Sequence, residues 1–168
     1  MALYTPEWYS KDRVIRINEI IKNYARTWGE TVLWFEYDSL ASTKHQVYDE
    51  GPSRAWYPPV TLPVTFIDFR QDDPIDTDEG FYVLSTASIN FQVTSAMDRF
   101  RISPLFTEAH FRDRFQYDNR IYRVTKYEKQ GLIHGTYLTV SALGEQVKGE
   151  EMVNDVQQGD FFSQTLVW

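Results

Sequence analysis

Histidine, serine and acidic side chains are the groups of this chain that could carry catalysis or bind a metal ion. The three histidines, His45, His110 and His134, are scattered, and none lies in an H-E-x-x-H or His-x-His arrangement. The sequence contains no glycine-rich nucleotide motif and no G-x-S-x-G elbow. We therefore expect a protein that is not an enzyme and has no cofactor, in which each histidine is a surface residue or a hydrogen-bonded one.

The segment from Gln71 to Gly80 is the densest cluster of carboxylates and is a candidate for calcium binding. Its acids are Asp72, Asp73, Asp76, Asp78 and Glu79. A calcium-binding EF-hand loop needs acids at alternate positions, a glycine at its sixth position and a glutamate at its twelfth, and this segment does not fit that register. The pattern favours a solvated turn, with an adventitious cation site as the alternative.

Composition excludes several classes of site. The chain has 168 residues, a length typical of one domain, and no cysteine, which rules out disulfides, thiolate zinc sites and iron–sulfur clusters. The net charge of −7 argues against tight binding of nucleic-acid phosphates. The first residues have no secretory signal pattern, and no apolar run approaches the length of about 20 residues that spans a membrane, so we expect a soluble protein made in a cytosol.

Basic residues concentrate between positions 99 and 129, while the rest of the chain is acidic. They are Arg99, Arg101, Arg112, Arg114, Arg120, Arg123 and Lys126. We interpret them as solvated charges or as partners in salt bridges between subunits. A groove with exposed aromatic rings, which could stack bases or sugars, is the alternative.

An amphipathic helix is predicted at the N-terminus, opened by Thr5 or Ser10 and closed before Gly29, where a left-handed residue would suit the helix end. Its apolar residues recur at spacings of three and four. The helix either packs on its own domain or forms an arm on a neighbouring subunit, and the candidate interface residues are Trp8, Ile17, Ile21, Tyr24 and Trp28.

The remainder of the chain is predicted to be rich in β-strands. Strands are expected at 31–37, 61–70, within 81–94, at 115–118, 121–129 and 136–143, with a long loop at 38–59 and a short helix near 104–111. Asp118 and Asn119 tolerate the positive φ angles of a two-residue hairpin turn. Pro63 is expected to push the start of its strand toward a sheet edge.

Two further segments are predicted to have a special role. Gln130 to Gly135 is expected to be a glycine-hinged loop with an apolar tip, formed by Gly131, Leu132, Ile133 and Gly135. The chain ends on an aromatic run that would be costly to leave in water, so it either packs on its own fold or covers another subunit. Its candidate interface residues are Phe161, Phe162 and Trp168.

The order of these parts resembles that of a known family. One part of the resemblance is the opening stretch Tyr48-Asp49-Glu50-Gly51, Arg54, Trp56 and Leu62-Pro63-Val64. The other is Asp113-Arg114-Phe115-Gln116-Tyr117-Asp118-Asn119-Arg120-Ile121-Tyr122-Arg123-Val124, in which Asn119 stands where the family often has glycine. These stretches are similar to those of the head-to-tail connector proteins of tailed bacteriophages, in the stopper or head-closure group, over roughly residues 45–145.

The resemblance implies a mainly β fold, a small β-barrel with an N-terminal amphipathic helix and a short inserted helix. The chain would then divide into a helical arm at 1–30, a barrel domain at 31–145 and an interface-forming tail at 146–168. The family assembles as rings of six or twelve copies in the phage neck, between portal or adaptor proteins and the tail. Such a ring closes the channel on double-stranded DNA after packaging, without sequence-specific binding, and docks the tail terminator or tube.

The acidic segment and the glycine-hinged segment are both candidates for loops that line or plug that channel. A tail terminator or another neck ring protein is the nearest alternative function. A carbohydrate-binding β-sandwich, with exposed Trp and Tyr as a sugar platform, is the alternative from another class. A small hydrolase is a third option, but the sequence does not show the pair of converging acids that it would need.

Overall fold

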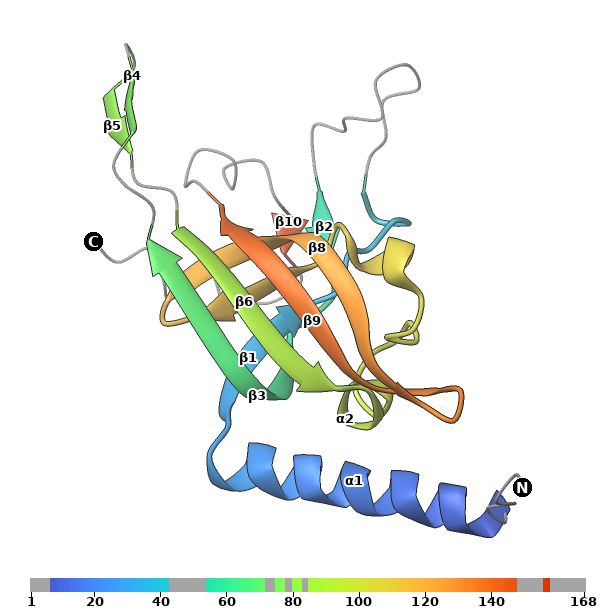
Figure 1. Ribbon diagram of the computed structural model, residues 1–168. Coiled ribbons are helices and arrows are strands. Elements are labelled where there is room, and N and C mark those ends of the chain that lie inside the picture. The colour runs from blue at the N-terminus through green and yellow to red at the C-terminus, as the bar shows by residue number, and fades with distance from the viewer. Residues whose placement is uncertain are drawn as a thin grey trace.

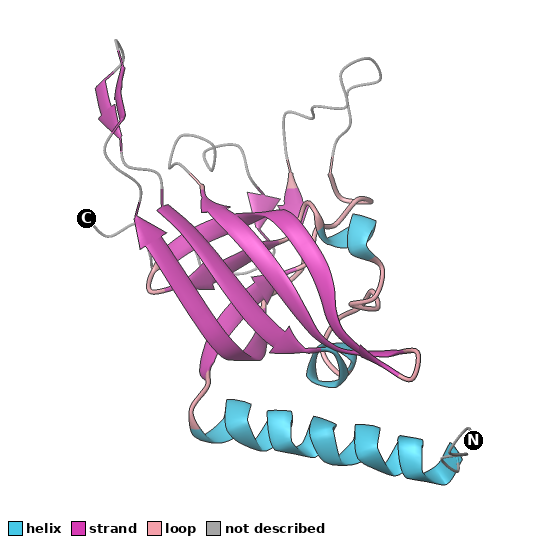
Figure 2. Ribbon diagram, in the orientation of Figure 1, coloured by secondary structure: helices cyan, strands magenta, loops and turns pink. Residues whose placement is uncertain are grey.

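The computed structural model describes residues 7–42, 54–71, 75–77, 80–82, 85–147 and 156–157, with the backbone alone for 7–10, 75–77, 80–82 and 156–157. Six strands form a closed antiparallel barrel (Figures 1 and 2). In barrel order they are β1 (Glu30–Phe35), β3 (Val60–Gln71), β6 (Ser85–Gln92), β9 (Thr136–Gln146), β8 (Arg120–Ile133) and β7 (Arg114–Tyr117). The fold expected from the sequence, a small β-barrel with an N-terminal helix, is confirmed.

Aromatic side chains fill the interior of the barrel. Trp34 is fully buried, and its ring lies within 6.5 Å, centre to centre, of the rings of Phe91, Phe100, Phe115 and Tyr127. Inward positions on the other strands carry Val, Leu, Ile and Ala at alternate residues, as expected for a barrel wall with one face buried. The barrel is therefore a packed core, and its interior cannot serve as a channel.

Two hairpins close with turns that need positive φ. Asp118 and Asn119 join β7 to β8 with φ angles of 48° and 58°, so the predicted two-residue turn is confirmed. The predicted loop at 130–135 is wrong in extent, because β8 continues to Ile133. Only His134 and Gly135, with φ angles of 49° and 78°, form the turn into β9. Pairing with β9 along its whole length turns the expected flexible loop into a rigid hairpin.

The helix α1 (Glu7–Thr27) lies beneath one end of the barrel and packs on β3 and β6 (Figure 1). Gly29 joins it to β1, but not as the left-handed residue that we predicted, since its φ is not positive. A Cβ at this position would lie 2.2 Å from the carbonyl oxygen of Val64 and 2.4 Å from that of Ala25. Glycine is required here because the helix end approaches the backbone of β3 closely.

A segment from Val93 to Asp113 connects the bottom of β6 to β7 and covers one side of the barrel. It contains α2 (Val93–Met97), where the sequence had predicted the end of a strand, and the 3-10 helix η1 (Thr107–His110). The predicted helix at 104–111 is therefore shorter and tighter than expected. The segment begins beside α1, where α2 packs on β3, β6 and β9, and it reaches β8 at η1.

Two short pairs of strands lie outside the barrel. β4 (Ile75–Thr77) pairs with β5 (Gly80–Tyr82), and β2 (Ala55–Trp56) pairs with β10 (Val156–Gln157). The predicted loop at 38–59 thus contains a strand. The predicted edge position of Pro63 is also wrong, since β3 lies between β1 and β6 in a barrel that has no edge.

Candidate interaction surfaces

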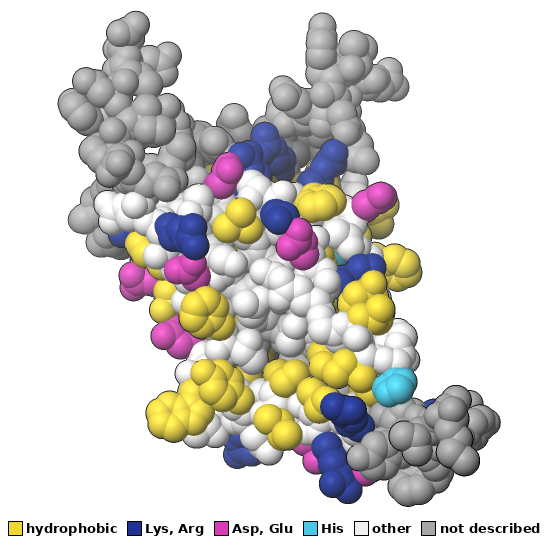
Figure 3. Space-filling model, in the orientation of Figure 1, with side chains coloured by type: hydrophobic (Ala, Val, Ile, Leu, Met, Phe, Trp, Pro, Cys, Tyr) yellow, Lys and Arg dark blue, Asp and Glu magenta, His cyan; other side chains and the backbone are white. Residues whose placement is uncertain are grey.

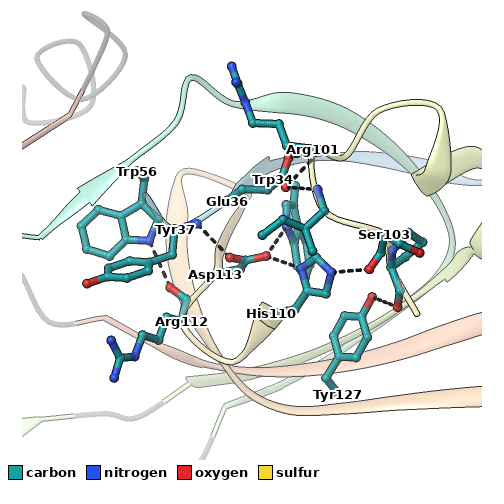
Figure 4. Close-up of polar contacts among 12 residues, drawn as sticks. Trp34, Glu36, Tyr37, Trp56, Arg101, Ser103, His110, Arg112, Asp113 and Tyr127 are labelled. Atoms are coloured by element: carbon teal, nitrogen blue, oxygen red, sulfur yellow. Dashed lines mark hydrogen bonds and ion pairs between the residues drawn. The ribbon is translucent and has the colours of Figure 1, made fainter. Parts of the chain in front are cut away.

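A buried polar cluster fastens the 93–113 segment to the barrel (Figure 4). His110 is 1% exposed, with Nδ1 2.7 Å from Oδ2 of Asp113 and Nε2 3.1 Å from the carbonyl oxygen of Ser103. Both of these partners are acceptors, so both ring nitrogens must carry a proton. The geometry makes His110 an imidazolium ion in a buried ion pair with Asp113.

Asp113 also binds two groups of the barrel wall. Its Oδ2 accepts a hydrogen bond from the indole Nε1 of Trp34 at 3.0 Å, and its Oδ1 accepts one from the backbone N–H of Tyr37 at 2.9 Å. One carboxylate therefore joins the segment to β1 and to the chain that follows it. We call His110, Asp113, Trp34 and Ser103 the latch.

Neighbouring groups reinforce the latch. The carboxylate of Glu36 accepts hydrogen bonds from the backbone N–H groups of Arg101, at 2.8 and 3.0 Å, and Ile102, at 3.1 Å. The hydroxyl of Tyr127 donates to the carbonyl oxygen of Pro104 at 2.8 Å. The segment is thus held at several points by side chains from the barrel.

The pKa of His110 is raised above its ordinary value of 6.5. Burial alone would lower the pKa, and it is the largest single influence. The hydrogen bond and the negative charge of Asp113, the carbonyl of Ser103 and the charge of Glu36 together outweigh burial. The charged form is the one that the fold stabilises.

The latch has no accessible group with which to act on a substrate. Both nitrogens of His110 are used within the fold, and the partner from Ser103 is its backbone oxygen rather than its hydroxyl. Within the residues that the structure describes, no cluster of three or more His, Asp or Glu side chains could hold a metal ion. The interpretation of His110 as a hydrogen-bonded residue is confirmed.

Several cations of the 99–129 region stack on aromatic rings. The guanidinium carbon of Arg101 lies 4.2 Å from the ring centre of Tyr57, and that of the buried Arg114 lies 3.8 Å from the ring centre of Trp56. The guanidinium carbon of Arg120 lies 5.1 Å from the ring centre of Phe69. Such cation–π contacts occupy the charges and the ring faces together. These three cations are therefore in contact with aromatic rings of their own chain.

The first exposed apolar surface lies on α1. Val14, Ile17, Ile21 and Ala25 occupy the side of the helix turned to the barrel, where Ala25 is buried and the other three are half-buried. Ile20, Tyr24 and Trp28, four residues apart on the adjoining flank, are 67%, 53% and 77% exposed. We call these three side chains the arm face. Figure 3 shows hydrophobic side chains gathered where α1 meets the barrel.

The second exposed apolar surface belongs to the 93–113 segment. Ile102, Phe106 and Phe111 are 38%, 66% and 42% exposed. They lie around η1, which packs on β8, whereas the C-terminal part of α1 is joined to β3 at Gly29. In the closed order of six strands, β3 and β8 are diametrically opposite. We call this second group the loop face. It lies on the β8 side of the barrel, whereas the arm face lies beneath the barrel end, where α1 packs on β3 and β6.

The structure brings some of the predicted site residues together and leaves others outside its described part. Tyr24 and Trp28 share the arm face, while Ile17 and Ile21 face the barrel instead. The four predicted residues of the β8–β9 turn region gather at one hairpin tip: Gly131, Leu132, Ile133 and Gly135. The described residues include no side chains for Trp8 and Asp76, and they exclude Asp72, Asp73, Asp78, Glu79, Phe161, Phe162 and Trp168.

Sequence reasoning missed the loop face and the latch. The His110-x-x-Asp113 spacing, which places both side chains on one side of a helical turn, was the one available signal for the latch. Phe106 and Phe111 had no periodic pattern that would indicate exposure. Their exposure follows from the packing of η1 on β8, which no local pattern indicates.

No helix in the described part of the chain is both long and apolar enough to cross a membrane. The alternative of a β-sandwich is wrong, since the strands close into a barrel. Comparison with models of known protein families and with curated proteins gave no match.

Proposed function

We propose that this protein is a head-to-tail connector of a tailed bacteriophage, in the stopper group. It forms a homo-oligomeric ring in the neck of the virion, closes the portal channel after DNA packaging, and offers the docking surface for the tail. The observation that carries this proposal is the pair of separate exposed apolar faces, one beneath the end of the barrel and one on its β8 side. The resemblance of residues 45–145 to such proteins agrees with it.

Separate and dissimilar faces are suited to a ring. When one face of a subunit binds a different face of the next, the contact repeats around a circle if the rotation closes. The arm face carries Ile20, Tyr24 and Trp28, and the loop face carries Ile102, Phe106 and Phe111. Tryptophan, tyrosine and phenylalanine are enriched in the cores of such interfaces.

A filled barrel agrees with a channel formed between copies. DNA cannot thread a core packed with Trp34, Phe91 and Phe115, so the passage would lie on the axis of the ring. The net charge of −7 suits a wall along which phosphates pass without being held. The rigid β8–β9 tip, with Leu132 58% exposed, is a suitable element to project toward that axis.

Assembly of the purified chain tests the proposal. Native mass spectrometry and negative-stain electron microscopy are expected to show rings of six or twelve copies. Trp28→Ser combined with Tyr24→Ser should leave a folded monomer, because both side chains lose the area that a neighbour would cover. Leu40→Ser is the matched control, since Leu40 is 91% exposed but lies in neither face.

The result that contradicts the proposal is equally concrete. A chain that stays monomeric at all concentrations, both alone and mixed with the portal and tail proteins of its own phage, would exclude a ring. Absence of the protein from purified virions, measured by mass spectrometry, would exclude the neck location.

A further inference from the structure

A basic groove lies between the C-terminal half of α1 and the end of the barrel. Its volume is about 460 Å³. The residues that decide its character are Lys22, Ala25, Arg26, Pro63, Asp98 and Arg99. The groove is open to a partner, and Gly29 fixes its shape by setting the helix directly on β3.

The charge of the groove is opposite to that of the whole chain. Three cations line it against the single carboxylate of Asp98, in a protein of net charge −7. Lys22 and Arg26, one turn apart, form no ion pair with any other residue that the structure describes. Arg99 donates from Nη1 to the carbonyl oxygen of Ser95 at 2.7 Å, which orients its guanidinium. A ligand for this groove should be acidic.

β4 and β5 lie at the other end of the barrel from α1 (Figure 1). β4 and β5 form a two-stranded hairpin that stands away from the barrel wall (Figure 1). An isolated two-stranded hairpin is marginally stable in water and needs a surface to pack on. The segment that contains it carries five acids among the ten residues from Gln71 to Gly80.

We propose that this acidic hairpin docks in the basic groove of a second copy of the chain. The same copy cannot make the contact. The groove lies beside Pro63, and the stretch of β3 from there to Gln71 spans roughly 25 Å, at about 3.3 Å per residue. Hairpin and groove are therefore two ends of one subunit, and their union is a head-to-tail contact between subunits.

This inference rests on the proposed ring and makes it more specific. It adds a charged contact to the apolar one, so that the order of subunits is set by charge as well as by area. It also removes the acidic hairpin from the channel wall. The β8–β9 tip is then the element left to line the passage.

Charge reversal tests the contact in the assembled protein. One variant carries Lys22→Glu with Arg26→Glu. The other carries Asp73→Lys, Asp76→Lys, Asp78→Lys and Glu79→Lys, which leaves one acid against four lysines in residues 71–80 and so reverses the charge of the hairpin. Each alone should fail to form rings, because like charges then meet. An equal mixture should assemble into rings that alternate the two variants, since each reversed groove then meets a reversed hairpin. Lys11→Glu with Arg13→Glu, on the exposed N-terminal part of the same helix, is the matched control and should assemble normally.

The inference is overturned if the groove variant assembles as well as the unmodified chain, or if the mixture fails to assemble. A binding experiment distinguishes failure of the hairpin–groove contact from failure of the proposed ring assembly. A fluorescent peptide of residues 70–83 should bind the unmodified chain, and binding should weaken by about tenfold or more with the groove variant or when the acids are replaced by amides.

A chain that stays monomeric but binds the peptide in this way would contradict the ring and support the groove as a docking site for an acidic segment. A chain that forms rings but does not bind the peptide, with groove variants that still assemble, would contradict only the inference.

Discussion

The barrel core and the α1 arm differ in how completely their side chains are buried and hydrogen-bonded within the chain. In the core, Trp34 is fully buried and its indole N–H donates a hydrogen bond to Asp113. Both ring nitrogens of His110 and both carboxylate oxygens of Asp113 also have hydrogen-bond partners. On the arm, Trp28 is 77% exposed although it continues the same apolar stripe as the residues that touch the barrel. The contrast is between a core whose buried ion pair is fully hydrogen-bonded and an arm that leaves a large apolar side chain in water.

The largest expected effect is on the core. Asp113→Ala leaves the His110 imidazolium, the Trp34 indole N–H and the Tyr37 N–H without an acceptor. Loss of one partner of a buried ion pair costs about 3–5 kcal/mol, so unfolding in urea should begin at a much lower concentration.

Asp68→Ala is the control for this comparison. Asp68 pairs with Arg70 at 3.1 Å on the surface, where such pairs contribute only about 0–1 kcal/mol. Equal losses of stability in the two variants would contradict the central role given to the latch.

The junction between the two regions is expected to show the next largest effect. Gly29→Ala places a Cβ 2.2 Å from the Val64 carbonyl oxygen, and overpacking of this kind costs about 1–3 kcal/mol. Since the new Cβ meets backbone oxygens, which cannot move aside as the end of a flexible side chain would, the helix should be displaced from β3 while the barrel stays folded. Hydrogen exchange would then rise in α1 and not in β8. Gly135→Ala is the control for space, because no atom lies within 4 Å of a Cβ there, although its positive φ adds a strain of its own.

The latch should make stability depend on pH. Because the folded pKa of His110 is raised above 6.5, its proton stabilises the fold fully below that value. The stabilisation is lost as pH rises through the folded pKa, where neutral His110 no longer donates to both acceptors. Thermal unfolding at a series of pH values should show this decline, and His110→Gln should remove it. A decline that persists in the variant would assign the effect to another group.

The smallest expected effect on stability is on the arm itself. Trp28→Ser removes a side chain that the monomer leaves mostly in water, so its unfolding free energy should change by no more than about 0.5 kcal/mol. Chemical denaturation of the monomeric fraction checks this. A loss as large as that of Gly29→Ala would show that Trp28 packs on its own barrel and would weaken the proposed interface.

Local features of the fold could be predicted wherever the residue type strongly favours one backbone conformation. Asp118 and Asn119 indicated their hairpin turn because both tolerate positive φ. The three- and four-residue spacing of Ile17, Ile21 and Tyr24 indicated α1, since apolar residues at this spacing fall on one face of a helix. The extent of the strands was less predictable. β8 continues past Gly131, whose φ of 70° glycine adopts without strain, because Gln130 and Leu132 on either side pair with β9.

The order of residues is enough to indicate a chain rich in strands, with an amphipathic N-terminal helix and without cysteine chemistry. Which apolar residues are covered depends instead on how the elements pack. Tyr24 and Ile21 are alike in the stripe of α1, but only Ile21 meets the barrel. Tertiary packing also decides that His110 is a buried ion, because its pKa depends on a carboxylate and a carbonyl that folding places around it. Residue patterns along a chain indicate local conformational preference. The burial of a side chain and its charge depend on residues distant in the sequence that folding brings next to it.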